Sequence, residues 1–350
     1  MLTLDKVFNA QSVLKNIIRE TKLVRAYGIA PECELFLKPE NLQITGSFKI
    51  RGSAYKIAML SDEEKLNGVI ACSAGNHAQG VALAATKSGI KSLICLPDTA
   101  PLSKIEATKS FGAEVCLVKG CYDDAYKKAL ELRDSEGYTF VHPFDDENVI
   151  AGQGTIALEV LNELENIDAI VVSIGGGGLI SGIAFTAKQI KPSVKIYGVQ
   201  VVGAPSMYDS VKCNSIECLR NVQTIADGIA VKQPGENTFR YVSEYVDDIA
   251  LVTDDEVASA ILGLIEKQKM IAEGAGAAAV AAVMFDKFSL KGKRVVSIVS
   301  GGNIDVTSLS RVIERGLFKS GRSSNLLIEL IDKPVSSRIF QKLSLTTVQM

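Results

Sequence analysis

Residues 169–182 read AIVVSIGGGGLISG, an apolar run that ends in four glycines and continues into a second apolar segment. A strand that is covered on both faces reads as a continuous apolar run, which is typical of parallel sheets. Glycines after such a strand allow the backbone to turn sharply into a helix. The stretch therefore predicts one strand, turn and helix unit of an α/β protein.

The same alternation of short apolar runs and helical segments continues over most of the chain from about residue 34. Strands are predicted at 34–38, 68–72, 92–96, 114–118, 169–173, 195–200 and 294–299. Apolar residues at three- and four-residue spacing predict helices at 123–133, 155–164 and 254–269, and the Ala-rich stretch 274–285 predicts a buried helix. We therefore expect an α/β fold with helices on both faces of mostly parallel sheets.

The composition excludes several classes of partner. The 350 residues carry 38 Lys and Arg against 40 Asp and Glu, a net charge of −2. Because no basic cluster is present, nucleic-acid binding is not expected. The most apolar stretch, 274–285, is well short of the ~20 residues of a membrane-spanning helix, so no membrane partner is expected. Residues 1–20 lack the basic and apolar regions of a secretory signal, which favours a cytoplasmic protein.

The cysteine and histidine content argues against a metal site. The chain has seven Cys and two His and contains no CxxC pair, whereas zinc sites use closely spaced Cys and His ligands. Cys72, Cys95 and Cys116 lie in apolar runs, where a thiol packs as a small hydrophobic group. We expect reduced cysteines and no metal.

The glycine run is also a candidate phosphate site. Gly175, Gly176, Gly177 and Gly178, with Leu179, connect the predicted strand to a helix, so their N–H groups can converge on a phosphate at the positive end of the helix dipole. Each glycine costs roughly 0.5–1 kcal/mol relative to Ala in ordered structure, which favours a close approach to a ligand. The run has no GK[ST] ending and no GxGxxG register, which disfavours nucleotides.

A second candidate loop is SAGNHAQG, residues 73–80, which follows the predicted strand 68–72. The N–H groups at the start of the next helix can hold a carboxylate without a charged side chain. Ordinary helix capping by Ser or Asn explains this loop equally well, so the loop alone leaves both interpretations open.

Lys49 and Ser300 are candidates for the functional groups that bind the same ligand. Lys49 stands among small residues in TGSFKIRG, 45–52, where desolvation lowers its pKa and frees the amine for Schiff-base chemistry. A solvent-exposed lysine is the alternative. Ser300 begins SGGN at the end of another strand, where its hydroxyl can bond a ring nitrogen. Because the carboxyl ends of parallel strands meet, the loops should line one crevice and bind a ligand with phosphate, ring and aldehyde.

Six ordered motifs carry a resemblance to a known family: KPENLQITGSFKIRG (38–52), SAGNHAQGVA (73–82), GGGGLISG (175–182), TIADGIAV (224–231), EGAGA (273–277) and SGGNID (300–305). From about residue 21 to 321 the chain resembles the fold type II (β-family) pyridoxal-phosphate enzymes, and most closely the threonine dehydratases, also called threonine ammonia-lyases. The resemblance implies two αβα domains with pyridoxal 5'-phosphate in the cleft between them. The large cofactor domain would comprise 1–49 and 143–320, and the inserted small domain 50–142.

The resemblance also implies roles for individual residues. Lys49 would carry the cofactor as a Schiff base and act as the catalytic base, Phe48 would pack by the ring, and Asn76 would bond its 3-hydroxyl. The glycines at 175–178 and Leu179 would bind phosphate, and Ser300 the pyridine nitrogen. The substrate carboxylate would lie against Ser73, Ala74, Gly75, Asn76 and His77, with Glu273 and Gly228 near the ring.

The implied reaction is β-elimination of L-threonine to 2-oxobutanoate and ammonia, with L-serine going to pyruvate, in a homodimer or homotetramer. Ala74 stands where the similar serine racemases carry a proton-donating serine, so racemisation should be poor. Gln200 and Ser206 stand at the positions of their acidic cation ligands, so a divalent cation is not expected, while a monovalent one stays open. The preference for Thr or Ser and a biosynthetic or catabolic role also stay open.

Three alternatives remain at this stage. The first is another fold type II enzyme, either a racemase, a β-replacing synthase or a serine-preferring dehydratase. The others are an amino-acid sensor without catalysis and a nicotinamide enzyme. After residue 320, GRSSNLLIELIDKP (321–334) resembles the start of an ACT regulatory domain. Residues 321–350 are too few for the four strands and two helices of that domain, so we expect a truncated tail without feedback by isoleucine or valine.

Overall fold

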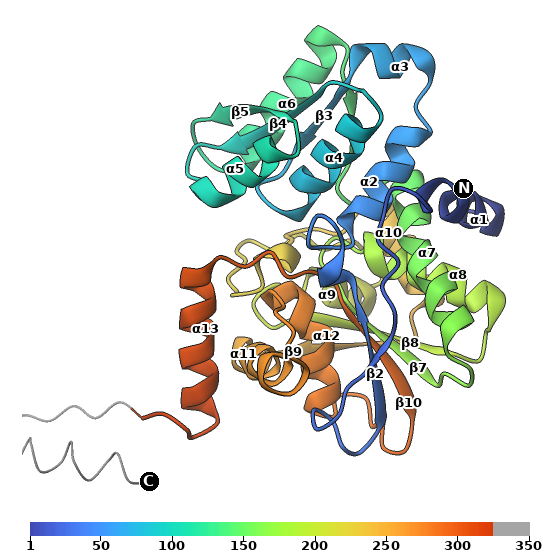
Figure 1. Ribbon diagram of the computed structural model, residues 1–350, viewed down its shortest axis with the longest axis vertical. Helices are drawn as coiled ribbons and strands as arrows, with labels where there is room; N and C mark the ends of the chain where they lie inside the picture. The colour runs from blue at the N-terminus through green and yellow to red at the C-terminus, as the bar shows by residue number, and fades with distance from the viewer. Residues whose placement is uncertain (325–350) are drawn as a thin grey trace, which may run out of the picture.

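Two separate β-sheets organise the protein in the computed structural model, which describes residues 1–324. The larger sheet has the strand order β1-β2-β10-β7-β8-β9 and the smaller one β5-β4-β3-β6. Figure 1 shows the smaller sheet with its helices above the larger one. Within the described residues the strand pairs are parallel, apart from β1 with β2. The predicted α/β class with mostly parallel sheets is confirmed.

The larger sheet contains β1 (Val24–Arg25), β2 (Glu34–Pro39), β7 (Ala169–Ser173), β8 (Lys195–Val201), β9 (Asp248–Val252) and β10 (Arg294–Val299). Around it lie α1 (Leu4–Leu14), α7 (Glu147–Glu163), α8 (Gly178–Ile190), α9 (Ser206–Cys213), α10 (Glu236–Tyr245), α11 (Asp254–Gly263), α12 (Gly274–Met284) and α13 (Val306–Lys319). Short turns of helix occur at η1 (Glu40–Leu42), η2 (Asp227–Ile229) and η3 (Leu264–Gln268), the last a π-helix.

The alternation of side chains along a strand explains why this sheet is apolar on both faces. Val171 of β7 belongs to the core under α11 and α12, whereas its neighbours Ile170 and Val172 belong to the core under α8. Successive strand residues point to opposite faces, so a strand covered on both sides needs apolar residues at every position. The predicted buried helix is α12, whose residues from Gly274 to Val283 are buried.

The smaller sheet contains β3 (Val69–Cys72), β4 (Ser92–Pro97), β5 (Glu114–Val118) and β6 (Thr139–Phe140). Its helices are α2 (Lys49–Ala58), α3 (Asp62–Asn67), α4 (Asn76–Lys87), α5 (Leu102–Ser110) and α6 (Tyr122–Glu136). Its two faces are covered differently. Val69 and Ala71 pack in the core with α2 and α4, whereas Ile70 and Cys72 pack with α6.

All seven predicted strands are present, with ends that differ by one residue or less. The predictions omitted β1 and β6, which have two residues each and offer no pattern, and β9, which is only partly buried. Helix α7 begins at Glu147 rather than at 155, because the Asp146 side chain caps its first turn. The helix predicted at 254–269 ends at Gly263 and continues as the π-helix η3.

The smaller sheet uses residues 69–140, and the larger sheet uses residues before 40 and after 168. One core cluster contains residues of both units, such as Ile94 of β4 together with Val7 of α1 and Ile150 of α7. The domain bounds 1–49 with 143–320, and 50–142, therefore stay a prediction. The expected ACT-like tail lies outside the described residues from 325 onward.

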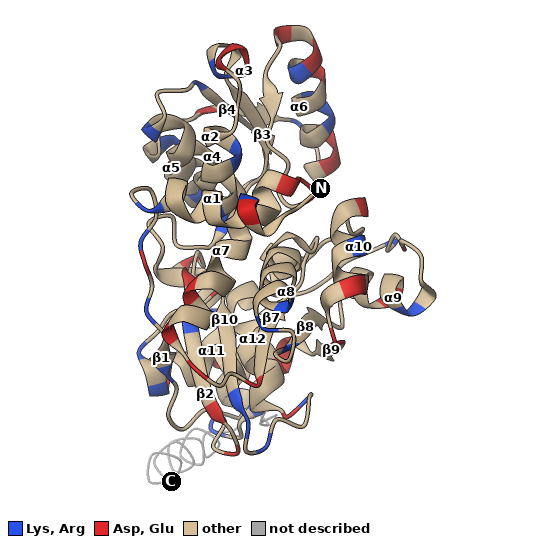
Figure 2. Ribbon diagram, turned by 90° about the vertical axis from the view of Figure 1, so that its right-hand side faces the viewer, with Lys and Arg blue, Asp and Glu red and all other residues tan. Residues whose placement is uncertain are grey.

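Surface charge is mixed, in keeping with the net charge of −2. Figure 2 shows Lys and Arg interspersed with Asp and Glu over the outer helices of both units. Among residues 1–324, no helix combines the length and the apolar character that crossing a bilayer requires. The seven cysteines are free thiols.

Candidate active site

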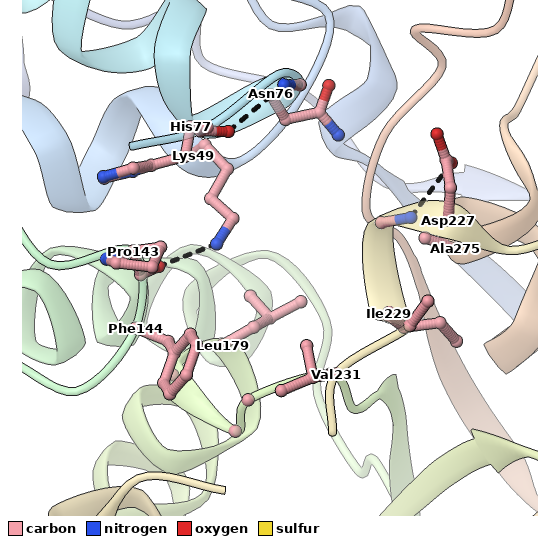
Figure 3. Close-up of a pocket in the computed structure, with 18 of the residues that line it drawn as sticks. Lys49, Asn76, His77, Pro143, Phe144, Leu179, Asp227, Ile229, Val231 and Ala275 are labelled. Atoms are coloured by element: carbon pink, nitrogen blue, oxygen red, sulfur yellow. Dashed lines mark hydrogen bonds between the residues drawn. The ribbon is translucent and has the colours of Figure 1, made fainter. Parts of the chain in front are cut away.

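A cavity of about 810 Å³ lies between the two sheets, and all the candidate residues from the sequence line it. They are Phe48, Lys49, Ser73, Ala74, Gly75, Asn76, His77, Gly175, Gly176, Gly177, Gly178, Leu179, Gly228, Glu273 and Ser300. The loops after β7 and β10 meet here because the carboxyl ends of parallel strands share one edge of the larger sheet, and the loop after β3 of the smaller sheet faces them across the cavity. Figure 3 shows Lys49, Asn76 and His77 on one side of the cavity, with Phe144 and Leu179 facing them.

Lys49 is the first residue of α2, and its amine reaches into the cavity. Its Nζ donates a hydrogen bond of 2.7 Å to the Pro143 carbonyl (Figure 3). The same Nζ lies 5.3 Å from the centre of the Phe48 ring. Burial lowers the pKa of Lys49 to about 8, although the carboxyl of Glu273 opposes the shift. The neutral amine is therefore available at a pH far below the ordinary lysine pKa.

Backbone contacts hold the loop before Lys49 against the loop that begins at Ser300. Phe48 donates its N–H to the Ser300 carbonyl at 3.1 Å, and Gly302 donates to the Gly46 carbonyl at 2.9 Å. Gly46 has φ +69°, and a Cβ built on it would lie 2.2 Å from Asn303 Oδ1. Only glycine fits this turn, so the sequence TGSFK fixes the position of Lys49 relative to Ser300.

A buried ion-pair network anchors α2 just beyond Lys49. The Arg51 guanidinium, fully buried, forms two hydrogen bonds of 2.8 Å to Glu40 and also bonds both carboxylate oxygens of Glu159. Lys38, also fully buried, bonds Glu159 and the Thr21 carbonyl. These contacts join α2 to β2 and α7, and they satisfy charges that would be costly to bury unpaired.

The loop after β3 presents free backbone donors at the start of α4. Within the described residues, the N–H groups of Asn76 and His77 have no hydrogen-bond partner, while the Ser73 hydroxyl accepts from Gly75 N–H at 3.1 Å. One nitrogen of the His77 ring is used elsewhere, because Nε2 lies 2.8 Å from the Val141 carbonyl, whereas the buried Nδ1 has no partner within the described residues. Burial lowers the pKa of His77 to about 3, so the ring is neutral. Any anion here must bind the backbone rather than the His77 ring.

The glycine loop presents a second row of free donors, at the start of α8. The N–H groups from Gly175 to Leu179 have no partner within the described residues. Gly177 has φ +98°, which favours glycine. A Cβ on Gly176 would lie 2.4 Å from the ring of Phe144, and a Cβ on Gly178 would lie 2.9 Å from Phe144 atoms. The packing of Phe144 therefore leaves no room for a side chain at Gly176 and Gly178.

Ser300 and Glu273 also line the cavity. The Ser300 hydroxyl, almost fully buried, makes only long contacts of 3.3 Å to the Ala275 carbonyl and 3.4 Å to the Ser173 hydroxyl. Glu273 Oε1 accepts a hydrogen bond of 2.6 Å from Asn76 Nδ2. Burial, with the nearby charge of Asp227, raises the pKa of Glu273 to about 7. A carboxyl and an amine with pKa values shifted toward neutrality thus share one cavity.

The sequence predictions missed several lining residues. His142, Pro143 and Phe144 follow β6, and Lys104 pairs with Asp227 at 2.7 Å from the other unit. The rarity of histidine could have pointed to His142. The chain has only two histidines, and both line the cavity. The partners of Lys104 and Pro143 lie far away in sequence, so local patterns gave no signal.

Of the two positions considered for a cation, Gln200 is used by the protein itself, whereas the buried Ser206 hydroxyl has no hydrogen-bond partner within the described residues. Gln200 Oε1 accepts from Tyr208 N–H at 2.8 Å, and Gln200 Nε2 lies 3.3 Å from the Ile174 carbonyl. Residues 1–324 contain no cluster of three or more His, Cys, Asp or Glu side chains with the spacing of metal ligands.

Comparisons with known proteins agree on one family. Residues 14–301 match the family described as "Pyridoxal-phosphate dependent enzyme". An L-threonine ammonia-lyase of Thermotoga maritima is 49% identical over 336 residues, which cover 95% of this chain and 84% of that protein.

Two solved structures are similar over most of their length. The processed form of threonine deaminase isoform 2 from Solanum lycopersicum has a TM-score of 0.85 and 38% identity, covering 89% of this chain and 93% of that chain. Maize serine racemase has a TM-score of 0.85 and 34% identity, covering 91% and 99%. With the family match spanning most of the sequence, these likenesses show that the chain belongs to the pyridoxal-phosphate dependent enzymes.

Proposed function

We propose that the protein is an L-threonine ammonia-lyase that converts L-threonine to 2-oxobutanoate and ammonia, and that also converts L-serine to pyruvate. The observation that carries the proposal is the 49% identity over 95% of the chain to an L-threonine ammonia-lyase. The cavity supports it, since Lys49 lies between two rows of free backbone donors.

The residues in the cavity fit pyridoxal phosphate. The partnerless N–H groups from Gly175 to Leu179 suit its phosphate, and the partly neutral amine of Lys49 suits its aldehyde. The Ser300 hydroxyl, with only long contacts of its own, suits the ring nitrogen. We assign Asn76 to the ring 3-hydroxyl and Phe48 to packing beside the ring. The one amine of Lys49 would serve two roles, holding the cofactor and acting as the base.

The bound cofactor supplies an electron sink that acidifies the Cα proton of an attached amino acid and favours loss of a β-hydroxyl. Lys49 Nζ takes the Cα proton, and burial keeps its pKa near 8 so that the amine can release and recover a proton. The free N–H groups of Asn76 and His77 bind the substrate carboxylate at the positive end of α4.

Ser300 affects the reaction because its side chain is a neutral hydroxyl rather than a carboxylic acid. Its neutral hydroxyl cannot protonate the ring nitrogen as a carboxylic acid would, which leaves the ring a milder sink and favours prompt loss of the β-hydroxyl. The cavity lies between the two units, so closure of the smaller unit over the substrate would exclude water from the reacting carbon.

The test is to incubate the purified holoenzyme with L-threonine and follow 2-oxobutanoate, in parallel with the Lys49→Ala variant. Release by the wild type alone supports the lyase and the base. A coloured holoenzyme that forms no keto acid from L-threonine or L-serine would refute the proposal. Product formation from L-serine alone would instead identify a serine-preferring lyase.

Serine racemase is the second candidate, favoured by the likeness to the maize enzyme. Racemisation needs a proton donor on the face opposite Lys49, and Ala74 offers a methyl group at the loop position where we expect that donor. We therefore expect D-serine formation to be slow in the wild type and faster in Ala74→Ser. Chiral chromatography of the reaction mixture distinguishes the two activities.

We further propose a cytoplasmic homo-oligomer, a dimer or tetramer, that acts on small amino acids and binds neither nucleic acid nor membrane. Mixed surface charge supports this proposal (Figure 2). Light scattering of the purified holoenzyme measures the oligomeric state.

A further inference from the structure

The side-chain amide of Asn76 is held by two residues of the other unit. Asn76 is the first residue of α4 in the smaller unit, whereas Asn303 follows β10 and Glu273 precedes α12. Asn76 Oδ1 accepts a hydrogen bond of 2.7 Å from Asn303 Nδ2, and Asn76 Nδ2 donates one of 2.6 Å to Glu273 Oε1. The orientation of Asn76 is thus set across the cavity rather than within its own unit.

A backbone carbonyl determines the orientation of the side-chain amides of Asn303 and Asn76. Asn303 Nδ2 also donates at 2.7 Å to the carbonyl oxygen of Thr45, which can only accept. Nδ2 rather than Oδ1 of Asn303 therefore lies toward Thr45 and Asn76, and the group it meets on Asn76 must be the acceptor, Oδ1. Hydrogen bonding to the Thr45 carbonyl thus identifies the nitrogen and the oxygen of both side-chain amides.

Packing keeps Asn303 in place. A Cβ on Gly46 would lie 2.2 Å from Asn303 Oδ1, so the amide rests directly against the glycine three residues before Lys49. The backbone bonds between Gly46 and Gly302, and between Phe48 and Ser300, hold the same two loops together. Asn303 therefore links the loop of Lys49, the loop of Ser300 and the loop of Asn76.

One hydrogen on Asn76 remains unused. The amide nitrogen has two hydrogens, and only the bond to Glu273 uses one of them within the described residues. Asn76 lines the cavity, so the second hydrogen is available to an oxygen acceptor bound there.

We infer that Asn303 is a positioning residue that fixes the Asn76 amide so that Asn76 offers the cavity a donor rather than an acceptor. The ligand group that suits such a donor is a phenolic oxygen, and this step rests on the role proposed above for Asn76. If the Asn76 amide were rotated by half a turn, Oδ1 would face Glu273 and the cavity, and that donor would be lost.

The experiment measures binding of pyridoxal phosphate to the apo protein and the position of the visible absorbance band, in the variants Asn303→Ala and Asn303→Asp. Asn303→Asp keeps the shape but replaces the donor with an acceptor, which favours the rotated Asn76. We expect cofactor binding about tenfold weaker and a displaced band in both variants, since a directed hydrogen bond is lost. Asn162→Asp, an exposed change on α7, is the charge-matched control and should leave both readouts unchanged.

The decisive comparison repeats both changes in an Asn76→Ala background. If Asn303 acts through Asn76, removing it there should change binding less than about twofold and should not move the band further. Equal effects with and without Asn76, or a wild-type band in both single variants, would overturn the inference. Asn303→Asp decides the matter if Asn303→Ala does not fold, as checked by circular dichroism.

These readouts require only the cofactor. Failure of the wild type to act on L-threonine would refute the proposed lyase and leave this test intact. Additive effects in the double variants would refute the role of Asn303 and leave the lyase intact.

Discussion

Lys49 shows how one side chain takes its chemical character from its surroundings. A lysine in water is protonated at neutral pH, but here burial lowers its pKa to about 8 while Glu273 partly opposes the shift. The amine also has a fixed position, because its hydrogen bond to the Pro143 carbonyl directs it into the cavity. Position and pKa together make it a candidate base and nucleophile.

The lowered pKa predicts how the cofactor attaches. Only a neutral amine attacks an aldehyde, so the rate at which apo protein takes up pyridoxal phosphate should rise with pH to a midpoint near 8, as followed by visible absorbance. Glu273→Gln removes the charge that raises the pKa of Lys49, so its midpoint should lie lower. A wild-type midpoint close to the ordinary 10.5 would contradict the prediction.

The same shift has a consequence for stability. Between pH 8 and 10.5 the unfolded chain binds more protons at Lys49 than the folded apo protein does. The free energy of unfolding should therefore increase with pH through this window, as far as Lys49 is concerned. Urea denaturation of the wild type and Lys49→Met across the window isolates this contribution, which only the wild type should show.

Among the elements, α8 begins at a glycine loop with no room for side chains. Gly176→Ala would place a methyl group 2.4 Å from the Phe144 ring. We expect this variant to lose about 1–3 kcal/mol of stability through overpacking, and to bind the cofactor more weakly. Gly263→Ala at the end of α11 is the matched control, because its Cβ meets nothing within 4 Å. Chemical denaturation of both apo variants tests this, and equal stability would contradict it.

Helix α2 depends on the buried charges beside Lys49. Arg51→Met leaves the buried Glu40 without its cation and removes one of the two cations that pair with Glu159, and the expected loss is about 3–5 kcal/mol in urea denaturation. Arg133→Met, which removes an exposed cation paired with Asp134, should change stability little. Adding Glu40→Gln to Arg51→Met should restore part of the loss, because it removes the buried carboxylate that has lost its cation, while Glu159 still pairs with Lys38. No recovery would argue that shape rather than charge holds α2.

For the molecule as a whole, two ion pairs cross the cavity between the units. Lys104 of α5 pairs with Asp227 of η2 at 2.7 Å, and Asp123 of α6 lies 3.5 Å from Lys232. All four residues line the cavity. These partly exposed pairs are individually weak, but they favour the arrangement in which the two units enclose the cavity.

Reversing one of these charges should therefore weaken substrate binding. In Lys104→Glu we expect the KM for L-threonine to rise about two- to fivefold at low salt, because fewer molecules populate the closed arrangement. Lys104→Glu with Asp227→Lys should recover most of the loss, and high salt should reduce the difference between wild type and single variant. An unchanged KM in the single variant at low salt would contradict this role.

The sequence alone determined the α/β class, the seven predicted strands and part of the cavity lining, but it missed three strands and the lining residues His142, Pro143, Phe144 and Lys104. The features that it determined depend on local patterns, such as the apolar run and glycines of 169–182 and the small residues around Lys49. A parallel sheet brings the ends of its strands together, which places the motifs after β7 and β10 at one edge, whereas the approach of the motif after β3 depends on how the two sheets pack together.

The tertiary structure decided how those residues behave. The bond between Asn76 and Glu273 joins residues 197 positions apart, and the bond between Asn303 and Asn76 joins residues 227 apart. Burial among such distant neighbours sets the pKa values of Lys49, Glu273 and His77 and leaves the His77 ring on the Val141 carbonyl. Hydrogen-bond partners and desolvation depend on positions in space, which no local pattern encodes.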